Sequence, residues 1–98
     1  MKQPNDCLNI QEIRVAIDSI DREVIAALGK RFEYVKAASK FKTSETSVKA
    51  PERFKSMLKQ RRIWAEEEAL NPDVIEKLYQ DLVSYFINEE LQDWQSKS

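Results

Sequence analysis

Two cationic side chains of this sequence stand where a helical pattern predicts apolar ones. Arg31 follows Val24 by seven residues and Ile17 by fourteen, so it projects within about 40° of the apolar line of one long predicted helix. Lys42 comes three helical turns later and projects within about 20° of Arg31. Such cations bind carboxylates strongly, so the pattern indicates an anion site. A salt-bridged Arg31, and a Lys42 that only stabilises the end of the helix, explain the same positions.

Two further arginines extend this set of cations. Arg14 precedes Arg31 by 17 residues, which is about 25 Å along a helix and about 100° around it. One ligand cannot contact both on one straight helix, whereas antiparallel pairing of two copies brings Arg14 of one toward Arg31 of the other. A solvated Arg14 paired with Asp18 is the simpler alternative. Arg53 stands at the start of the second predicted helix, just after residues 50–52.

One carboxylate falls on an apolar face. Glu90 follows Phe86 by four residues and Val83 by seven, on the broad apolar side of the third predicted helix. Burial without a full counter-charge raises the pKa of a carboxyl, so Glu90 is a candidate for a neutral hydrogen-bond donor near physiological pH. A one-residue change in the assigned face makes Glu90 an ordinary surface carboxylate.

The composition excludes much other chemistry. The chain has no His and one Cys, Cys7, so imidazole bases, Ser-His-Asp triads and Cys/His zinc sites cannot be assembled within one chain. Sixteen Lys and Arg against seventeen Asp and Glu provide no bulk attraction to nucleic acid or anionic lipid. With no apolar run of membrane-spanning length and no signal peptide, we expect a cytoplasmic protein with neither nucleic acid nor membrane as partner.

The elements that must position these residues are helices. One Gly, three Pro and no sustained period-two alternation predict an all-α chain that forms a single domain over residues 1–98. The prolines stand where helices begin and divide the chain into one long helix and two shorter ones. The predicted ranges are residues 8–10 to about 42, 50 or 51 to 68, and 72 to about 94, with Asp6 or Asn9 capping the first helix and Asn71 the third. Residues 43–48 are expected to form a mobile loop that closes over a ligand, or a simple connection.

The long helix predicts a second copy of the chain. Its apolar residues recur with a period close to 3.5, at Ile10, Ile13, Ile17, Ile20, Val24, Ala27 or Leu28, Val35 and Ala38. The helix is about 50 Å long, whereas a compact chain of this size has a radius of gyration of about 13 Å. Two shorter helices cannot cover it, so we expect an intertwined homodimer, with a monomeric long hairpin as the alternative.

As a set, these residues resemble the all-helical chorismate mutase (type II) family, and within it the isochorismate-pyruvate lyases of salicylate and siderophore synthesis. The likeness extends over nearly the whole chain. Four segments carry it: Ile13-Arg14-x-Ala16-Ile17-Asp18-x-Ile20-Asp21, Ala27-Leu28-Gly29-x-Arg31 with Tyr34-Val35-Lys36-Ala37-Ala38-Ser39-x-Phe41-Lys42, Ala50-Pro51-Glu52-Arg53, and Trp64-Ala65-Glu66-Glu67.

The resemblance implies an intertwined homodimer with two pockets, each binding a dianionic enolpyruvyl substrate without cofactor or metal. Arg31, Lys42 and Arg53 match the family's pocket positions, and Arg14 matches the Arg that the partner subunit contributes. Glu90 stands where the family usually has Gln. The family's reactions are pericyclic, so the resemblance implies catalysis by positioning and electrostatics, with Lys42 beside the breaking C–O bond and Arg31 and Glu90 holding the substrate.

Two departures separate lyase from mutase. Typical mutases of this family carry an acidic residue directly after Arg53 and often an Asp three residues before it, whereas this sequence has Phe54 and Ala50. The resemblance therefore favours the lyase, which converts isochorismate to salicylate and pyruvate, and leaves chorismate mutase as an alternative or secondary activity. A non-catalytic helical binding module is a third interpretation, for which only the basic cluster at residues 59–62 offers a nucleic-acid contact.

Overall fold

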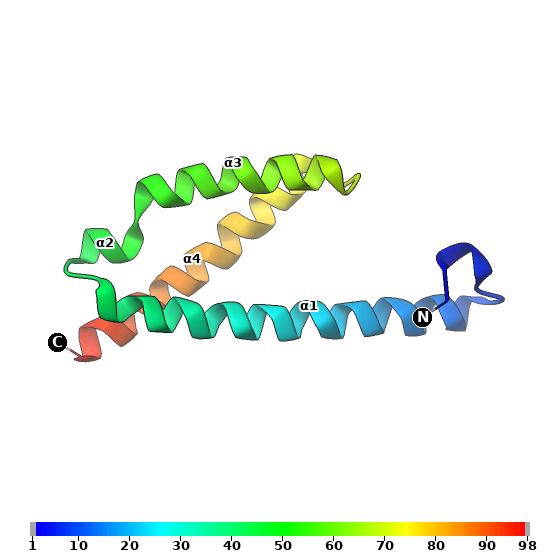
Figure 1. Ribbon diagram of the computed structural model, residues 1–98, viewed down its shortest axis with the longest axis horizontal. Helices are drawn as coiled ribbons and strands as arrows, with labels where there is room; N and C mark the ends of the chain where they lie inside the picture. The colour runs from blue at the N-terminus through cyan, green and yellow to red at the C-terminus, as the bar shows by residue number, and fades with distance from the viewer. Residues whose placement is uncertain (1, 98) are drawn as a thin grey trace. The chain divides into compact units, whose positions relative to one another are not determined.

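A computed structural model describes residues 2–97, and the regular elements within this range are all helices (Figure 1). Three long helices are α1 (Ile10–Ala38), α3 (Pro51–Glu67) and α4 (Pro72–Lys97). Shorter elements are two 3₁₀ helices, η1 (Pro4–Asp6) and η2 (Ser39–Phe41), and the five-residue helix α2 (Glu45–Lys49). The prediction of an all-α chain with one long and two shorter helices is confirmed. Among residues 2–97, no helix has the length and apolar character needed to cross a membrane.

Side-chain caps fix where the long helices begin. Asn9 Oδ1 accepts a hydrogen bond from the Glu12 backbone N–H at 2.9 Å, and Glu12 Oε2 accepts one from the Leu8 N–H at 2.7 Å. At α4, Asn71 Oδ1 accepts from the Asp73 N–H at 2.9 Å, and Pro72 occupies the first helical position. These bonds satisfy N–H groups that a helix start leaves without partners, and they confirm Asn9 and Asn71 as caps.

The chain between α1 and α3 differs from the prediction. Helix α1 ends at Ala38 and not near Lys42, because Ser39 Oγ donates to the Lys36 carbonyl at 2.7 Å as the chain tightens into η2. The predicted loop over residues 43–48 is wrong in part, since it contains most of α2. A reciprocal cap starts α2: Ser44 Oγ accepts from the Ser47 N–H, and Ser47 Oγ accepts from the Ser44 N–H, both at 3.1 Å.

The chain divides into two compact units, of which the first extends to Glu33. This N-terminal unit contains η1 and most of α1, and no residue of α1 is buried. The predicted apolar stripe is solvent-exposed in the single chain: Ile17 is 50%, Ile20 47% and Val24 49% exposed. The N-terminal unit therefore has an amphipathic helix but no core of its own.

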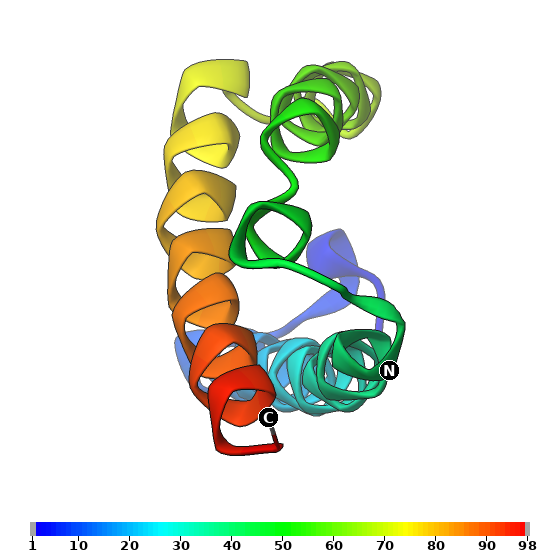
Figure 2. The same cartoon turned by 90° about the vertical axis from the view of Figure 1, so that its left-hand side faces the viewer.

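The C-terminal unit begins at Tyr34 and contains the buried residues of the described chain. Helices α3 and α4 are joined by a short turn and pack against each other, and Figure 2 shows α2 beside α4. The core consists of apolar side chains from all three helices: Val48, Met57, Ala65, Val83 and Phe86. This core anchors the short helix α2 through Val48, which is 2% exposed.

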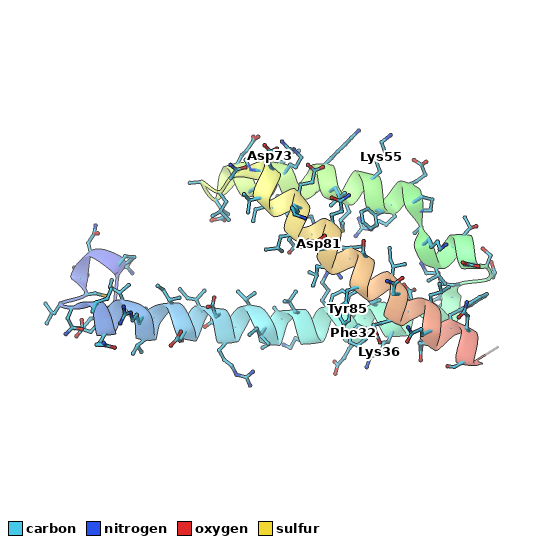
Figure 3. The ribbon with its side chains drawn as sticks, turned by 180° about the vertical axis from the view of Figure 1, so that it is seen from behind. Phe32, Lys36, Lys55, Asp73, Asp81 and Tyr85 are labelled. Atoms are coloured by element: carbon cyan, nitrogen blue, oxygen red, sulfur yellow. The ribbon has the colours of Figure 1, made fainter. Side chains whose placement is uncertain are left out.

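An ion-pair cluster links α3 to the start of α4. Arg62 Nη1 donates to Asp73 Oδ1 and to Glu76 Oε2, both at 2.8 Å, and Figure 3 shows Asp73 in the first turn of α4. The hydrogen bond to Asp73 raises the pKa of Arg62 above its ordinary value. Arg62 therefore pairs across the turn with α4.

Candidate active site

Lys42 is held by the short helix that the sequence pattern missed. The residue follows η2 with an extended backbone, φ −90° and ψ 138°. Its Nζ donates a hydrogen bond to the carbonyl oxygen of Ser47 in α2 at 2.8 Å and lies 3.9 Å from Glu90 Oε1 on α4. Helix α2 thus supplies a backbone acceptor that orients the ammonium group toward a buried carboxyl.

Glu90 is the carboxyl of this pair, and it is buried. Its residue is 5% exposed, which confirms its predicted place on the apolar face of α4. Among residues 2–97 its Oε1 accepts no hydrogen bond, because the Lys42 ammonium at 3.9 Å lies beyond hydrogen-bond distance. Burial raises the pKa of Glu90 above that of an ordinary glutamate; Lys42 opposes this shift and Asp93 adds to it. The site therefore favours the neutral carboxyl, which can donate a hydrogen bond to a ligand.

The last turns of α4 hold the segment that carries Lys42. Ser39 is 2% exposed and its Oγ donates to Asp93 Oδ2 at 3.1 Å. Trp94 Nε1 donates to the backbone carbonyl of Lys42, also at 3.1 Å. Neither contact was predicted from the sequence, although a half-buried indole N–H in general requires an acceptor. One stretch of α4 thus contacts both ends of the η2 segment.

The three arginines of the predicted site lie on α1 and α3. Arg14 is exposed on α1 in the N-terminal unit, and within the described chain its guanidinium has no carboxylate at ion-pair distance, so the simpler Arg14–Asp18 pair is absent. Arg31 belongs to the same unit and is half-buried. Arg53 lies exposed in the first turn of α3, and its guanidinium makes no hydrogen bond or ion pair with residues 2–97. Of the five predicted residues, the structure brings Lys42 and Glu90 together.

The two positions that separate lyase from mutase in the resemblance both lie at the start of α3. Ala50 ends α2 and precedes α3 in the left-handed conformation, φ 41° and ψ 61°. Phe54 lies one turn further on, and its backbone N–H donates to the Ala50 carbonyl at 2.9 Å. Both residues are half-buried. Neither side chain offers a polar atom to a ligand.

A separate cavity of about 600 Å³ lies in the N-terminal unit. Its wall is mostly apolar and is formed by the N-terminal segment and the first turns of α1: Lys2, Cys7, Asn9, Gln11, Glu12, Val15, Ala16 and Ser19. None of the predicted site residues lines it. Cys7 is half-buried there as a free thiol.

Comparisons with known proteins agree with the resemblance. The model of the chorismate mutase type II family matches residues 13–91, a range that contains Arg14, Arg31, Lys42, Arg53 and Glu90. The isochorismate pyruvate lyase of Pseudomonas aeruginosa is 46% identical over 94 residues, which cover 96% of this chain and 93% of that protein. The T-protein of Haemophilus influenzae is 37% identical over 81 residues, which cover 82% of this chain and 20% of that longer protein.

Proposed function

Because this chain belongs to the chorismate mutase type II family, we propose that it is an isochorismate pyruvate lyase, which splits isochorismate into salicylate and pyruvate. The strongest support is the 46% identity to a protein of that name over nearly the full length of both chains. The contact between Lys42 and Glu90 is consistent with this reaction. It offers one cation and one buried carboxyl, whose pKa is raised by burial, to a substrate rich in oxygen acceptors.

The reaction needs no nucleophile. As the C–O bond between the ring and the enolpyruvyl ether oxygen breaks, a ring hydrogen moves to the methylene carbon of the enolpyruvyl group. The ring becomes salicylate and the side chain leaves as pyruvate, with no atom gained or lost. Negative charge develops on the ether oxygen, and Lys42 is the residue that we assign to stabilise it.

The remaining residues bind and orient the dianion. Arg31 and Arg53 are assigned to the two carboxylates, and the partner subunit's Arg14 completes the pocket. Bidentate arginine–carboxylate pairs fix orientation as well as affinity, so they hold the flexible enolpyruvyl arm over the ring. Glu90, whose pKa burial raises, is assigned to donate a hydrogen bond to the substrate in its protonated form, so that its carboxyl gains a partner for the buried oxygen atom Oε1.

This assignment requires a homodimer in which both units of each chain form one chorismate-mutase-type domain. The exposed apolar stripe of α1 supports this arrangement, because a second copy of the helix buries it. Pairing also supplies Arg14, which has no carboxylate partner among the described residues. A cytoplasmic location is part of the same proposal.

Chorismate mutase activity is the second candidate, because the family is named for it. A pocket that binds isochorismate also accommodates chorismate, which carries the same two carboxylates. The apolar side chains at Ala50 and Phe54 favour the lyase, since neither holds the ring hydroxyl of chorismate. We therefore expect prephenate formation to be the slower reaction.

The test is incubation of the purified protein with isochorismate and, separately, with chorismate. Salicylate fluorescence follows the lyase, and prephenate formation follows the mutase. Lys42→Ala is expected to abolish salicylate formation, whereas Lys55→Ala retains it, because Lys55 is an exposed lysine on α3 (Figure 3). Prephenate without salicylate would overturn the assignment of Ala50 and Phe54. Equal salicylate formation by both variants would remove Lys42 from the mechanism.

A further inference from the structure

The C-terminal end of α4 contacts the backbone of Lys42. Trp94 lies one turn after Glu90 on α4, and its indole N–H donates to the Lys42 carbonyl at 3.1 Å. Asp93 accepts from Ser39 Oγ, also at 3.1 Å. Glu90, Asp93 and Trp94 are spaced three and four residues apart, so they share one side of the helix. This side of α4 therefore carries the buried carboxyl and both contacts to the segment with Lys42.

The Trp94 bond lies at a point where the backbone has no helical partner. Residues 39–41 form a single 3₁₀ turn, and Lys42 leaves it with an extended backbone. The Lys42 N–H donates to the Ser39 carbonyl at 3.1 Å, and the Lys42 carbonyl accepts from Trp94. The indole thus sets how far the Lys42 main chain stands from α4, and therefore from Glu90.

We infer that Trp94 is a positioning residue, whose N–H fixes the Lys42 backbone so that the ammonium group reaches both Ser47 and the substrate beside Glu90, with Ser39–Asp93 as a second tether. The inference rests on the proposed function for its effect on turnover. Its geometric part, the Lys42–Glu90 separation of 3.9 Å, stands independently of any reaction.

The effect is measurable because Lys42 and Glu90 interact electrostatically. The charge of Lys42 lowers the pKa of Glu90, against burial and the charge of Asp93, which both raise it. A Lys42 that drifts from α4 loses this influence, and the pKa of Glu90 rises further. A purely structural role for Trp94 leaves the pKa of Glu90 unchanged in a folded variant.

The experiment titrates the full-length protein labelled with ¹³C at the glutamate carboxyl, with Glu90 assigned by its loss in Glu90→Gln. In Trp94→Phe we expect a higher pKa for Glu90 and a kcat for salicylate formation about tenfold lower, because one orienting hydrogen bond is lost. Trp64→Phe is the matched control: Trp64 is 47% exposed on α3, under the Arg61 guanidinium, and its replacement changes neither quantity.

Two further variants separate the positioning role of the Trp94 N–H from a general loss of packing around the Trp94 ring. Replacing Trp94 by 3-benzothienylalanine keeps the bicyclic ring but has sulfur in place of N–H, so it serves where phenylalanine does not fold. Asp93→Asn retains an oxygen acceptor for Ser39 and removes a negative charge, so the pKa of Glu90 is expected to fall.

The outcomes are distinct. A raised Glu90 pKa with lowered kcat in the Trp94 variants supports the inference. A Glu90 pKa equal to that of the unmodified protein in folded Trp94 variants overturns it, whatever their activity. If the unmodified protein makes no salicylate while the Glu90 pKa still rises in the Trp94 variants, the proposed function fails and the positioning of Lys42 by Trp94 stands.

Discussion

The two units of this chain have apolar side chains in similar proportion but bury them differently. In the C-terminal unit, Val48, Met57 and Phe86 are each at most 5% exposed, and three helices share one core. In the N-terminal unit, Ile17 and Val24 are about half exposed and α1 contributes no buried residue. The stripe on α1 nevertheless keeps a near-heptad period through this whole unit.

This difference in burial indicates how each unit is stabilised. A single helix gains little stability from its own hydrogen bonds, so α1 depends on tertiary or quaternary burial of its stripe. The C-terminal unit already buries its core and positions Lys42 beside Glu90. The N-terminal unit carries two of the proposed pocket arginines, Arg14 and Arg31. The comparison therefore assigns chemistry to one unit and assembly, with part of the binding, to the other.

The sharpest test of this division is complementation between inactive subunits. Arg14→Ala and Lys42→Ala are each expected to lower kcat/KM for isochorismate roughly 100-fold or more, because each removes a charge from the substrate or the transition state. Refolding the two variants together yields mixed dimers in which one of the two pockets has both residues. Salicylate formation should then recover to about a quarter of that of the unmodified protein, as random pairing dictates.

A refolded mixture of Arg53→Ala and Lys42→Ala is the matched control. Arg53 and Lys42 are assigned to the same subunit's half of the pocket, so each pocket of a mixed dimer lacks one of the two residues. No recovery of salicylate formation is therefore expected in this mixture. Activity that recovers equally in both mixtures, or in neither, would contradict the contribution of Arg14 by the partner subunit.

The next largest effect concerns the stripe itself. Val24→Glu places a charge on the face that a second α1 covers, and we expect the free energy of unfolding to fall by about 2–4 kcal/mol and the dimer to dissociate. Val15→Glu is the control, because Val15 lies nine residues away, hence about 180° around the helix, and is 68% exposed. For both variants, sedimentation velocity measures the dissociation of the dimer and chemical denaturation measures the free energy of unfolding. Equal effects of the two substitutions would show that the stripe has no partner.

The smallest effect is a pH dependence in the C-terminal unit. Burial raises the pKa of Glu90, so the folded protein holds this proton more tightly than the unfolded chain does. Stability therefore falls as pH rises from about 4, where unfolded glutamates ionise, through the raised pKa of Glu90, and the loss is complete above it. Turnover is expected to fall over the same upper range, because ionised Glu90 no longer donates a hydrogen bond.

Glu90→Gln removes this dependence, since an amide donates at any pH. In this variant, the free energy of unfolding and kcat should both keep their low-pH values up to a higher pH than in the unmodified protein. Glu89→Gln is the matched control on the same helix. Unchanged pH profiles in Glu90→Gln would contradict the role of the neutral carboxyl.

Local signals in the sequence predicted most of the fold. Asn9, Asn71 and Pro72 act within one helical turn, so they mark helix ends without knowledge of the tertiary structure. The burial of Glu90 followed from its spacing on α4. Helix α2 was missed because its residues are polar, and it depends on the Ser44–Ser47 cap and on Val48 in the core.

The contacts around Lys42 could not be predicted in the same way. Trp94 lies 52 residues from Lys42 in the chain, and the bond between them exists only once α4 packs beside η2. Ser47 presents its carbonyl to Lys42 only because α2 is helical. The resemblance supplied the residue roles, and the common pocket of the three arginines is part of the proposed homodimer.

Ala50 has a consequence for how this family changes its chemistry. The residue is the N-cap of α3, has a left-handed backbone and makes no side-chain capping bond. A Cβ in this conformation costs about 1–2 kcal/mol, whereas Asp and Asn adopt it more readily and also cap helices. The aspartate that mutases of this family often carry here is thus the better residue for the backbone. On the proposed assignment of this position, Ala50→Asp is therefore expected to favour chorismate over isochorismate while it stabilises the start of α3.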